Sequence, residues 1–249
     1  MHPPAGLTNQ AVLRTQLVHL GVRAGDVLML HVSMRRLGPV EGGADGLIDA
    51  LRASVGNAGT LVMVLDADPD EPFDPDTTPV DVEDMGIVAE IFRRRADHVN
   101  DHAAARFAAI GPDAQALLEP APLHHYFGHG SVLERLVGAR GRVLRLGADL
   151  DTVTLTHHAE YLADVPDKRL ARRRLVRADI GEQWIESLDD SHGIVDWPHG
   201  DYFPQILVDF LAAGHARLGP VGRCTAELLD AQPFVAFAVG WMHENLVPG

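Results

Sequence analysis

Hydrophobic positions along the chain form short continuous runs and segments with helical spacing. The runs 27–32, 59–65 and 141–147 are typical of strands that are buried on both faces. In 12–20 the apolar residues recur three and four positions apart, which predicts an amphipathic helix capped by Thr8. Strands that alternate with helices in this way favour an α/β core.

Further segments complete the expected architecture. Helices are expected at 44–54, 84–95, 111–118, 131–137, 203–213 and 225–246, and strands at 101–110 and 215–218. We expect Pro233 to break the last helix, because proline removes a backbone donor and clashes with the preceding turn. The basic segment 169–178, a β-turn at 179–181 and an acidic end at Asp190 predict a β-hairpin. The predicted fold is a single compact α/β domain with a small hairpin excursion at about 169–195.

Composition narrows the class of protein. With 249 residues, 46% of them hydrophobic, the chain is expected to bury one large core as a soluble globular domain over 1–249. The 35 acidic residues against 21 basic ones give a formal net charge of −14. This charge argues against a nucleic-acid or anionic-membrane partner and suits a cationic ligand, although it can also serve solubility alone.

Cysteine usage and the N-terminal segment bear on cellular location. The one cysteine, Cys224, excludes an internal disulfide framework and fits a reducing compartment. The first residues lack a basic segment followed by an apolar core, and no apolar run approaches the length of a membrane span. We therefore expect a cytoplasmic protein.

The segment 152–160 carries the strongest chemical signal. A run of threonines leads into His157, His158 and Glu160, and the residues that follow predict the first turns of a helix. Positions three apart share a helix face, so Thr154, His157 and Glu160 are expected along one side. A carboxylate that accepts one imidazole N–H fixes the tautomer and raises the basicity of the other nitrogen, as a general base requires. The alternative is an ordinary surface pair.

The loop 33–43 is the second informative segment. It joins a predicted buried strand to a predicted helix and combines Ser33, Arg35, Arg36 and several glycines. Small residues let backbone amides approach a ligand, and a strand, a loop and a helix in this order can cradle a phosphate. The loop matches neither the dinucleotide-binding fingerprint nor the phosphate-binding P-loop, so the pattern alone is a weak signal.

The segment 66–76 follows a predicted strand and is rich in proline and acidic residues. Its carboxylates are those of Asp66, Asp68, Asp70, Glu71, Asp74 and Asp76. The prolines predict an irregular loop, and strand ends in open α/β sheets are where ligand groups gather. The segment is therefore either a solvated acidic loop or an anionic wall for an amine-rich ligand.

Three histidines lie close together in the segment 120–130. The spacing of His124, His125 and His129 permits a zinc site, and together with aspartates it would suit a metal-dependent hydrolase. No cysteine and no HExxH motif accompanies them. We therefore expect no metal and keep the hydrolase as the less favoured alternative.

A set of short motifs resembles the antibiotic N-acetyltransferase family, the aminoglycoside 3-N-acetyltransferases, which differ in fold from the widespread GNAT acetyltransferases. These motifs are Leu20-Gly-Val22, Gly25-Asp26, His31-Val-Ser33 with Leu37-Gly38, Gly42-Gly43, Gly59-Thr-Leu-Val62, Glu71-Pro-Phe-Asp-Pro75, Arg106-Phe-Ala-Ala-Ile-Gly111, Val143-Leu144 to Gly147, Thr154 to Glu160 and Gly219-Pro-Val221. The resemblance is in register from about Leu13 to Pro166 and looser beyond.

The chain departs from the family pattern in three motifs. Val32 and Ala103 stand where the family has a serine and a proline. The usual Leu-His-Leu-Ala-Glu is Thr156-His-His-Ala-Glu160 here, which aligns the family's histidine with His157. These departures bear on the cofactor loop and leave His157 and Glu160 intact.

The resemblance implies an enzyme that acetylates the 3-amino group of the 2-deoxystreptamine ring of aminoglycosides with acetyl-CoA and so confers antibiotic resistance. His157 would take a proton from the substrate ammonium, with Glu160 as its partner. Thr154, or backbone amides at the start of its helix, would stabilise the oxyanion, and His31 would either assist proton transfer or be a buried structural histidine. Acetyl-CoA would be attacked directly, without an acyl-enzyme.

The resemblance also suggests where the two substrates bind. Acetyl-CoA is expected to contact Ser33, Met34, Arg35, Arg36, Leu37, Gly38, Phe107 and Ala108, with an arginine at the phosphates and the last two residues at the pantetheine. The ammonium groups of the antibiotic are expected at Asp68, Asp70, Asp189 and Asp190. A same-fold acetyltransferase for a non-antibiotic amine is the main rival, and monomer and homodimer both stay open.

Overall fold

The computed structural model of the protein describes residues 6–67 and 71–247. Over this part of the chain, a seven-stranded sheet has the strand order β3-β4-β2-β1-β5-β9-β8. Its strands are β1 (Val27–Val32), β2 (Thr60–Val64), β3 (His98–Val99), β4 (Phe107–Ile110), β5 (Arg142–Leu146), β8 (Arg217–Val221) and β9 (Cys224–Asp230). The central strand β1 is parallel to β2 and β5, whereas the other neighbouring strands are antiparallel.

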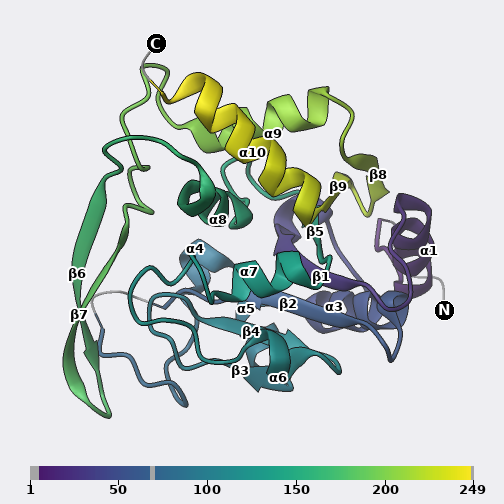
Figure 1. Cartoon of the computed structure of the whole chain (residues 1–249). Coiled ribbons are helices and arrows are strands. Elements are labelled where there is room, and N and C mark those ends of the chain that lie inside the picture. Colours follow the sequence, from purple (N-terminus) through teal and green to yellow (C-terminus); the bar gives the residue numbers. More distant parts are fainter. Residues whose placement is uncertain (1–5, 68–70, 248–249) are drawn as a thin grey trace.

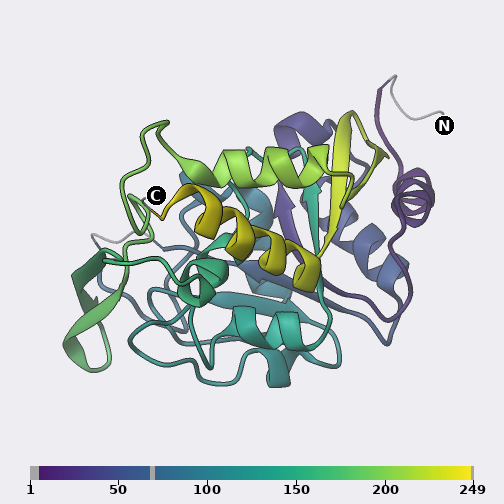
Figure 2. The same cartoon turned by 45° about the horizontal axis from the view of Figure 1, so that its top comes forward.

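Helices cover both faces of this sheet (Figure 1, Figure 2). One core lies between the sheet and a helical layer of α1 (Gln10–Leu20), α2 (Met34–Leu37), α3 (Gly43–Val55) and α5 (Ile87–Arg95). A second core lies under α6 (Ala114–Leu117), α7 (Val132–Gly138), α8 (Leu155–Leu162), α9 (Tyr202–Ala212) and α10 (Ala231–Asn245). The short helix α4 (Val82–Met85) precedes α5. These layers confirm the predicted α/β core.

A separate two-stranded hairpin projects from one side of the sheet, at the left of Figure 1. Its strands β6 (Leu170–Arg177) and β7 (Gly181–Leu188) are antiparallel, as predicted. Phe73 exchanges backbone hydrogen bonds of 2.7 and 2.8 Å with Val176 and Ala178, which ties the acidic segment to the hairpin. The hairpin ends at Asp189 and Asp190, so its docking decides where these two carboxylates lie.

The carboxyl ends of the three central strands meet at one edge of the sheet. Ser33 follows β1, Asp66 lies just beyond β2, and the segment 147–154 connects β5 to α8. Ligands in open α/β sheets bind in the crevice outside such strand ends. This edge therefore brings together the three segments that the sequence singled out.

Several expected elements differ at their bounds. Asn9, and not Thr8, caps α1, since its Oδ1 accepts a 2.8 Å hydrogen bond from the amide of Val12. The helix expected at 84–95 is divided at Gly86, whose φ of 78° no continuous helix adopts. The strand expected at 101–110 is confined to β4, at Phe107–Ile110.

The helix expected at 225–246 is wrong in its first part. Residues from Cys224 to Asp230 form β9, because they pair with both β5 and β8 and bury their apolar side chains in the sheet. Pro233 lies in the first turn of α10 and does not break it, since amides there have no partner in the helix. Among the helices of the described residues, none is long and apolar enough to cross a membrane.

Candidate active site

A histidine and a glutamate on α8 form a buried pair at the strand-end edge. Nδ1 of His157 lies 3.0 Å from Oε2 of Glu160, so the pairing predicted from their spacing is confirmed. The side chain of Glu160 is 1% exposed and that of His157 is 17% exposed. The alternative of an ordinary surface pair is therefore wrong. A carboxylate so buried depends on hydrogen bonds to offset its lost hydration.

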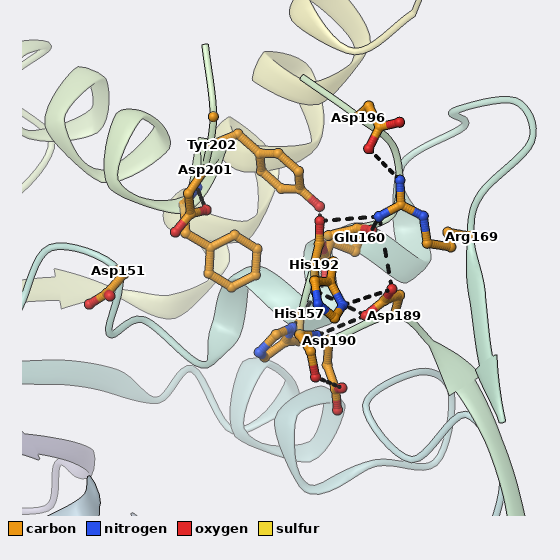
Figure 3. Close-up of a pocket in the computed structure, with 14 residues that line it drawn as sticks. Asp151, His157, Glu160, Arg169, Asp189, Asp190, His192, Asp196, Asp201 and Tyr202 are labelled. Carbon is orange, nitrogen blue, oxygen red and sulfur yellow. Dashed lines mark hydrogen bonds and ion pairs between the residues drawn. The ribbon is translucent and has the colours of Figure 1, made fainter. Parts of the chain in front are cut away.

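Tyr202, from α9, completes the hydrogen bonds of Glu160. Its hydroxyl donates to Oε1 of Glu160 and accepts a 2.9 Å hydrogen bond from the amide of Ile194. Figure 3 shows the Tyr202 hydroxyl pointing at Glu160 from above, with His157 below. Burial, followed by the charge of Glu160, raises the pKa of Tyr202, so the phenol keeps the proton that it donates. Both oxygens of the carboxylate are thus engaged.

The imidazole of His157 is held between two aromatic rings. Phe127 stacks on it with ring centroids 5.0 Å apart, and Phe203 lies at 4.8 Å. Burial by itself lowers the pKa of His157, but the hydrogen bond and charge of Glu160, helped by other carboxylates, raise it above its ordinary value. Because a carboxylate only accepts, Nδ1 carries the shared proton and Nε2 is the basic nitrogen.

Three adjoining pockets surround this pair. The acidic pocket, of about 600 Å³, is lined by His157, Asp190 and residues from α9. The reaction pocket, of about 510 Å³, shares His157 and Asp190 with it. The loop pocket, of about 330 Å³, shares His31 with the reaction pocket and is lined by the start of the loop after β1. The reaction pocket therefore lies between the other two, with His31 and His157 in the shared walls.

The start of the expected cofactor loop lines the loop pocket. Ser33, Met34 and Arg35 face it, opposite residues of α4 and α5. Arg36 instead bonds to Asp149 and donates at 2.9 Å to the carbonyl of Gly147. Arg35 is thus placed to meet a ligand, whereas Arg36 ties the loop to the segment after β5.

Other expected cofactor residues lie in the interior. Leu37, Phe107 and Ala108 are buried in the two cores and line none of the three pockets. Gly38, at φ 86°, lies against Arg223, whose Cδ would be 2.6 Å from a Cβ at this position. The expectation that Phe107 and Ala108 line a ligand pocket is therefore not met. Their strand β4 instead supports β2, which leads to Asp66.

His31 lies where the loop pocket meets the reaction pocket, and Thr154 lies in the wall of the reaction pocket. His31 is 4% exposed and lines both the loop and the reaction pocket. Burial, helped by the charge of Arg145, lowers its pKa to about 3, so the ring is neutral at ordinary pH and a poor base. Its Nε2 has no hydrogen-bond partner among the described residues. Thr154 lines the reaction pocket, and its hydroxyl caps no amide of α8.

The predicted substrate aspartates have mixed outcomes. Asp189 and Asp190 both line the acidic pocket, but each is already bonded within the protein. Oδ1 of Asp189 accepts hydrogen bonds of 3.0 Å from two backbone amides. Asp190 forms an ion pair of 2.6 Å with Arg173. Asp68 and Asp70 lie outside the described residues.

Other carboxylates, which sequence reasoning did not select as contacts, face the pockets. They are Asp66, Glu71, Asp81, Glu83, Asp84, Asp149, Asp151, Asp196 and Asp201. Asp66 is exposed to the pocket, but the protein around it displaces part of its hydration, and this loss, together with the charge of Asp190, raises its pKa. Its position directly after β2 was a signal for this placement. Tyr202 had no such signal, because it lies 42 residues from Glu160 in the chain.

The three clustered histidines do not converge. His124 accepts from the amide of Glu186 at 3.1 Å, and His129 pairs with Glu134 at 2.9 Å. Within the residues that the structure describes, no three His, Cys, Asp or Glu side chains are grouped so that they could hold a metal ion. The geometry of His124, His125 and His129 therefore gives the hydrolase alternative no support.

Comparisons with known proteins agree on one family. A family model described as aminoglycoside 3-N-acetyltransferase matches residues 29–243. The aminoglycoside N(3)-acetyltransferase III of Serratia marcescens is 37% identical over 253 residues, which cover 91% of this chain and 94% of the relative. The solved structure of AAC-IIIb in a binary complex with CoASH has a TM-score of 0.89 at 34% identity, covering 98% and 99% of the two chains. AAC-VIa bound to sisomicin has a TM-score of 0.84 at 32% identity, covering 95% and 97%.

Proposed function

The chain belongs to the family of aminoglycoside 3-N-acetyltransferases, and on this premise we propose that it acetylates aminoglycoside antibiotics and confers resistance to them. The acetyl group of acetyl-CoA is transferred to the 3-amino group of the 2-deoxystreptamine ring. The observation that carries this proposal is the buried His157–Glu160 pair at the point where the reaction pocket meets the acidic pocket. The bound CoASH of AAC-IIIb and the sisomicin of AAC-VIa support the two substrates.

His157 acts as the general base. An amine is an ammonium at neutral pH, and it must lose a proton before its lone pair can attack a thioester carbon. Nε2 of His157 takes that proton directly or through a water molecule, while Glu160 stabilises the imidazolium through Nδ1. Such base catalysis contributes roughly 10² to 10⁴ in rate. Tyr202 holds the second oxygen of Glu160, so that the first stays aimed at the imidazole.

Attack produces a tetrahedral intermediate with an oxyanion, which needs a donor. The hydroxyl of Thr154 lines the reaction pocket and carries a hydrogen that it can donate to the oxyanion. As the carbon–sulfur bond breaks, the amine nitrogen loses its second proton and the sulfur leaves as the thiol of coenzyme A. The products are the amide, coenzyme A and one released proton, and neither Cys224 nor Ser33 serves as a nucleophile.

Acetyl-CoA binds along the loop pocket. Ser33, Met34 and Arg35 contact it, with Arg35 at the phosphates, because a guanidinium pairs well with phosphate oxygens. The thioester then reaches the reaction pocket past His31. The neutral ring of His31 serves there as a hydrogen-bonding group through its unpartnered Nε2 and not as a second base.

The antibiotic binds from the acidic pocket to His157. Its ammonium groups are matched by carboxylates that face the pockets without an arginine partner among the described residues, such as Asp66, Asp84, Asp151 and Asp201. The long-range field of a chain with net charge −14 also attracts such a polycation. Asp189 supports the pocket wall through its bonds to the backbone amides of Ser191 and His192.

Release of thiol from acetyl-CoA tests this function. Purified protein is assayed with gentamicin, apramycin and a simple non-aminoglycoside amine side by side. Turnover with the aminoglycosides alone is the expected result. Turnover with the simple amine and not with either antibiotic would instead support the same-fold acetyltransferase for another substrate, and no thiol release with any of them would contradict the proposed reaction.

A further inference from the structure

An ion pair at the end of the hairpin faces the reaction pocket. Arg173, in β6, donates through Nη2 to both carboxylate oxygens of Asp190, at 2.7 and 2.6 Å. Both side chains line the reaction pocket, and Asp190 also lines the acidic pocket that contains His157. The pair therefore stands in the wall of the site proposed for the antibiotic.

The carboxylate of Asp190 has little capacity left for a ligand. The buried hydroxyl of Tyr126 donates to its Oδ2 at 2.6 Å, and the hydroxyl of Ser191 lies 3.4 Å from Oδ1. An ionised carboxylate offers about four acceptor positions, and the two Arg173 contacts occupy the others. An ammonium group that approached Asp190 would have to displace a guanidinium that already neutralises it.

Arg173 itself retains donors that the protein does not use. It also bonds to the hydroxyl of Tyr126 through Nη2, whereas its Nη1 makes no hydrogen bond within the part of the chain that the structure describes. A guanidinium carries five N–H donors and no acceptor. Near this side chain, a ligand oxygen would find a donor, whereas a ligand ammonium would meet a like charge. Arg173 is thus a fixed cation in a pocket whose lining also includes carboxylates such as Asp66.

We propose that Arg173 is a specificity-determining residue that reserves the part of the pocket beside Asp190 for an uncharged oxygen substituent of the antibiotic. A hydroxyl or ether oxygen is accepted there, and an ammonium group is excluded. This proposal rests on the proposed function, since it names which ring substituents the same site tolerates. It also gives the hairpin a role in substrate selection, because β6 carries the arginine.

Two pairs of antibiotics test this selection. Kanamycin A and kanamycin B differ by a hydroxyl against an amine at one ring position, and paromomycin and neomycin differ in the same way at another. For each pair, kcat/KM of the amine member is divided by that of the hydroxyl member. We expect the wild-type protein to favour the hydroxyl member of at least one pair. In that pair, Arg173→Gln should raise the ratio about tenfold or more, equivalent to about 1.4 kcal/mol.

Arg174→Gln is the matched control. Arg174 is the next residue of β6, and it forms an exposed ion pair of 3.0 Å with Glu182 outside the three pockets. The substitution changes the net charge by the same amount and should leave both ratios within about twofold, because exposed ion pairs contribute little. An equal change of the ratios in both variants would attribute the effect to the overall field and overturn the proposal.

Asp190→Asn provides a second, opposite test that does not depend on the folding of Arg173→Gln. This variant leaves the charge of Arg173 uncompensated. The kcat/KM of the amine member relative to that of the hydroxyl member should therefore fall below the wild-type ratio. The proposal is overturned if the wild type favours the amine member of both pairs, or if Arg173→Gln folds normally and leaves both ratios unchanged. A wild-type protein that acetylates none of the four antibiotics would instead contradict the proposed function itself.

Discussion

Replacing Glu160 by glutamine removes one charge from the catalytic pair while keeping the shape of the side chain. Glu160 accepts from Nδ1 of His157 at one oxygen and from the hydroxyl of Tyr202 at the other. An amide can accept at only one end, because its other end is a donor. The Tyr202 oxygen already accepts from the amide of Ile194, and its proton needs an acceptor. Either Tyr202 or His157 therefore loses its acceptor in the variant.

The expected size of this effect follows from the bond that is lost. A hydrogen bond to a charged group is worth about 1.5 to 3 kcal/mol. The pKa of His157 should therefore fall in Glu160→Gln, because the imidazolium loses this bond and the charge of Glu160. Glu160 raises this pKa in the native protein, so its loss moves the acid limb of the kcat profile to lower pH. The plateau should fall about tenfold or more, because a weaker base assists proton transfer less.

The measurement is the rate of thiol release across pH at saturating acetyl-CoA and gentamicin. Glu134→Gln is the control, because Glu134 forms another His–Glu pair, 2.9 Å from His129, on the surface and outside the three pockets. That variant should keep both the plateau and the acid limb of the wild type. If Glu160→Gln also kept the wild-type plateau and acid limb, the pair on α8 would be structural and the reasoning would be refuted.

Three further substitutions separate cofactor binding from base catalysis. Arg35→Ala should raise the KM for acetyl-CoA about tenfold and leave that for gentamicin nearly unchanged, as loss of one charged hydrogen bond requires; Arg36→Ala should chiefly lower the melting temperature, because Arg36 bonds to Asp149. If Arg35→Ala left the KM for acetyl-CoA unchanged in steady-state kinetics and Arg36→Ala raised it, Arg35 would not bind the phosphates. Tyr202→Phe should lower kcat about tenfold and move the acid limb to higher pH, because Glu160 without this donor holds the imidazolium more strongly. If the acid limb of the kcat profile did not move in Tyr202→Phe, Tyr202 would contribute only to packing.

Features that depend on neighbours in the sequence could be predicted. The apolar runs that became β1, β2 and β5 are buried on both faces, and such strands read as continuous hydrophobic segments. Likewise, the spacing of three between His157 and Glu160 was enough to pair them, because helix geometry alone sets that contact. The hairpin followed from its turn and its two charged segments.

Features that depend on docking between distant segments could not be predicted. Tyr202 reaches Glu160 only because the first turn of α9 contacts α8, and no local pattern marks that contact. Asp190 was expected to be free for an ammonium group, but the folded hairpin turns Arg173 onto it. The apolar residues of β9 were compatible with a helix, and pairing with β5 on one side and β8 on the other decided the outcome.

The central claim, that His157 is the base, is tested most directly by turnover of His157→Ala. Acetyl-CoA binding is measured by calorimetry in the same protein, with His129→Ala, at an exposed position outside the pockets, as the control. The account predicts at least about a 100-fold loss of kcat in His157→Ala, with acetyl-CoA affinity within about threefold of the wild type. Turnover within tenfold of the wild type, with acetyl-CoA still bound, would contradict it and move the base to another residue.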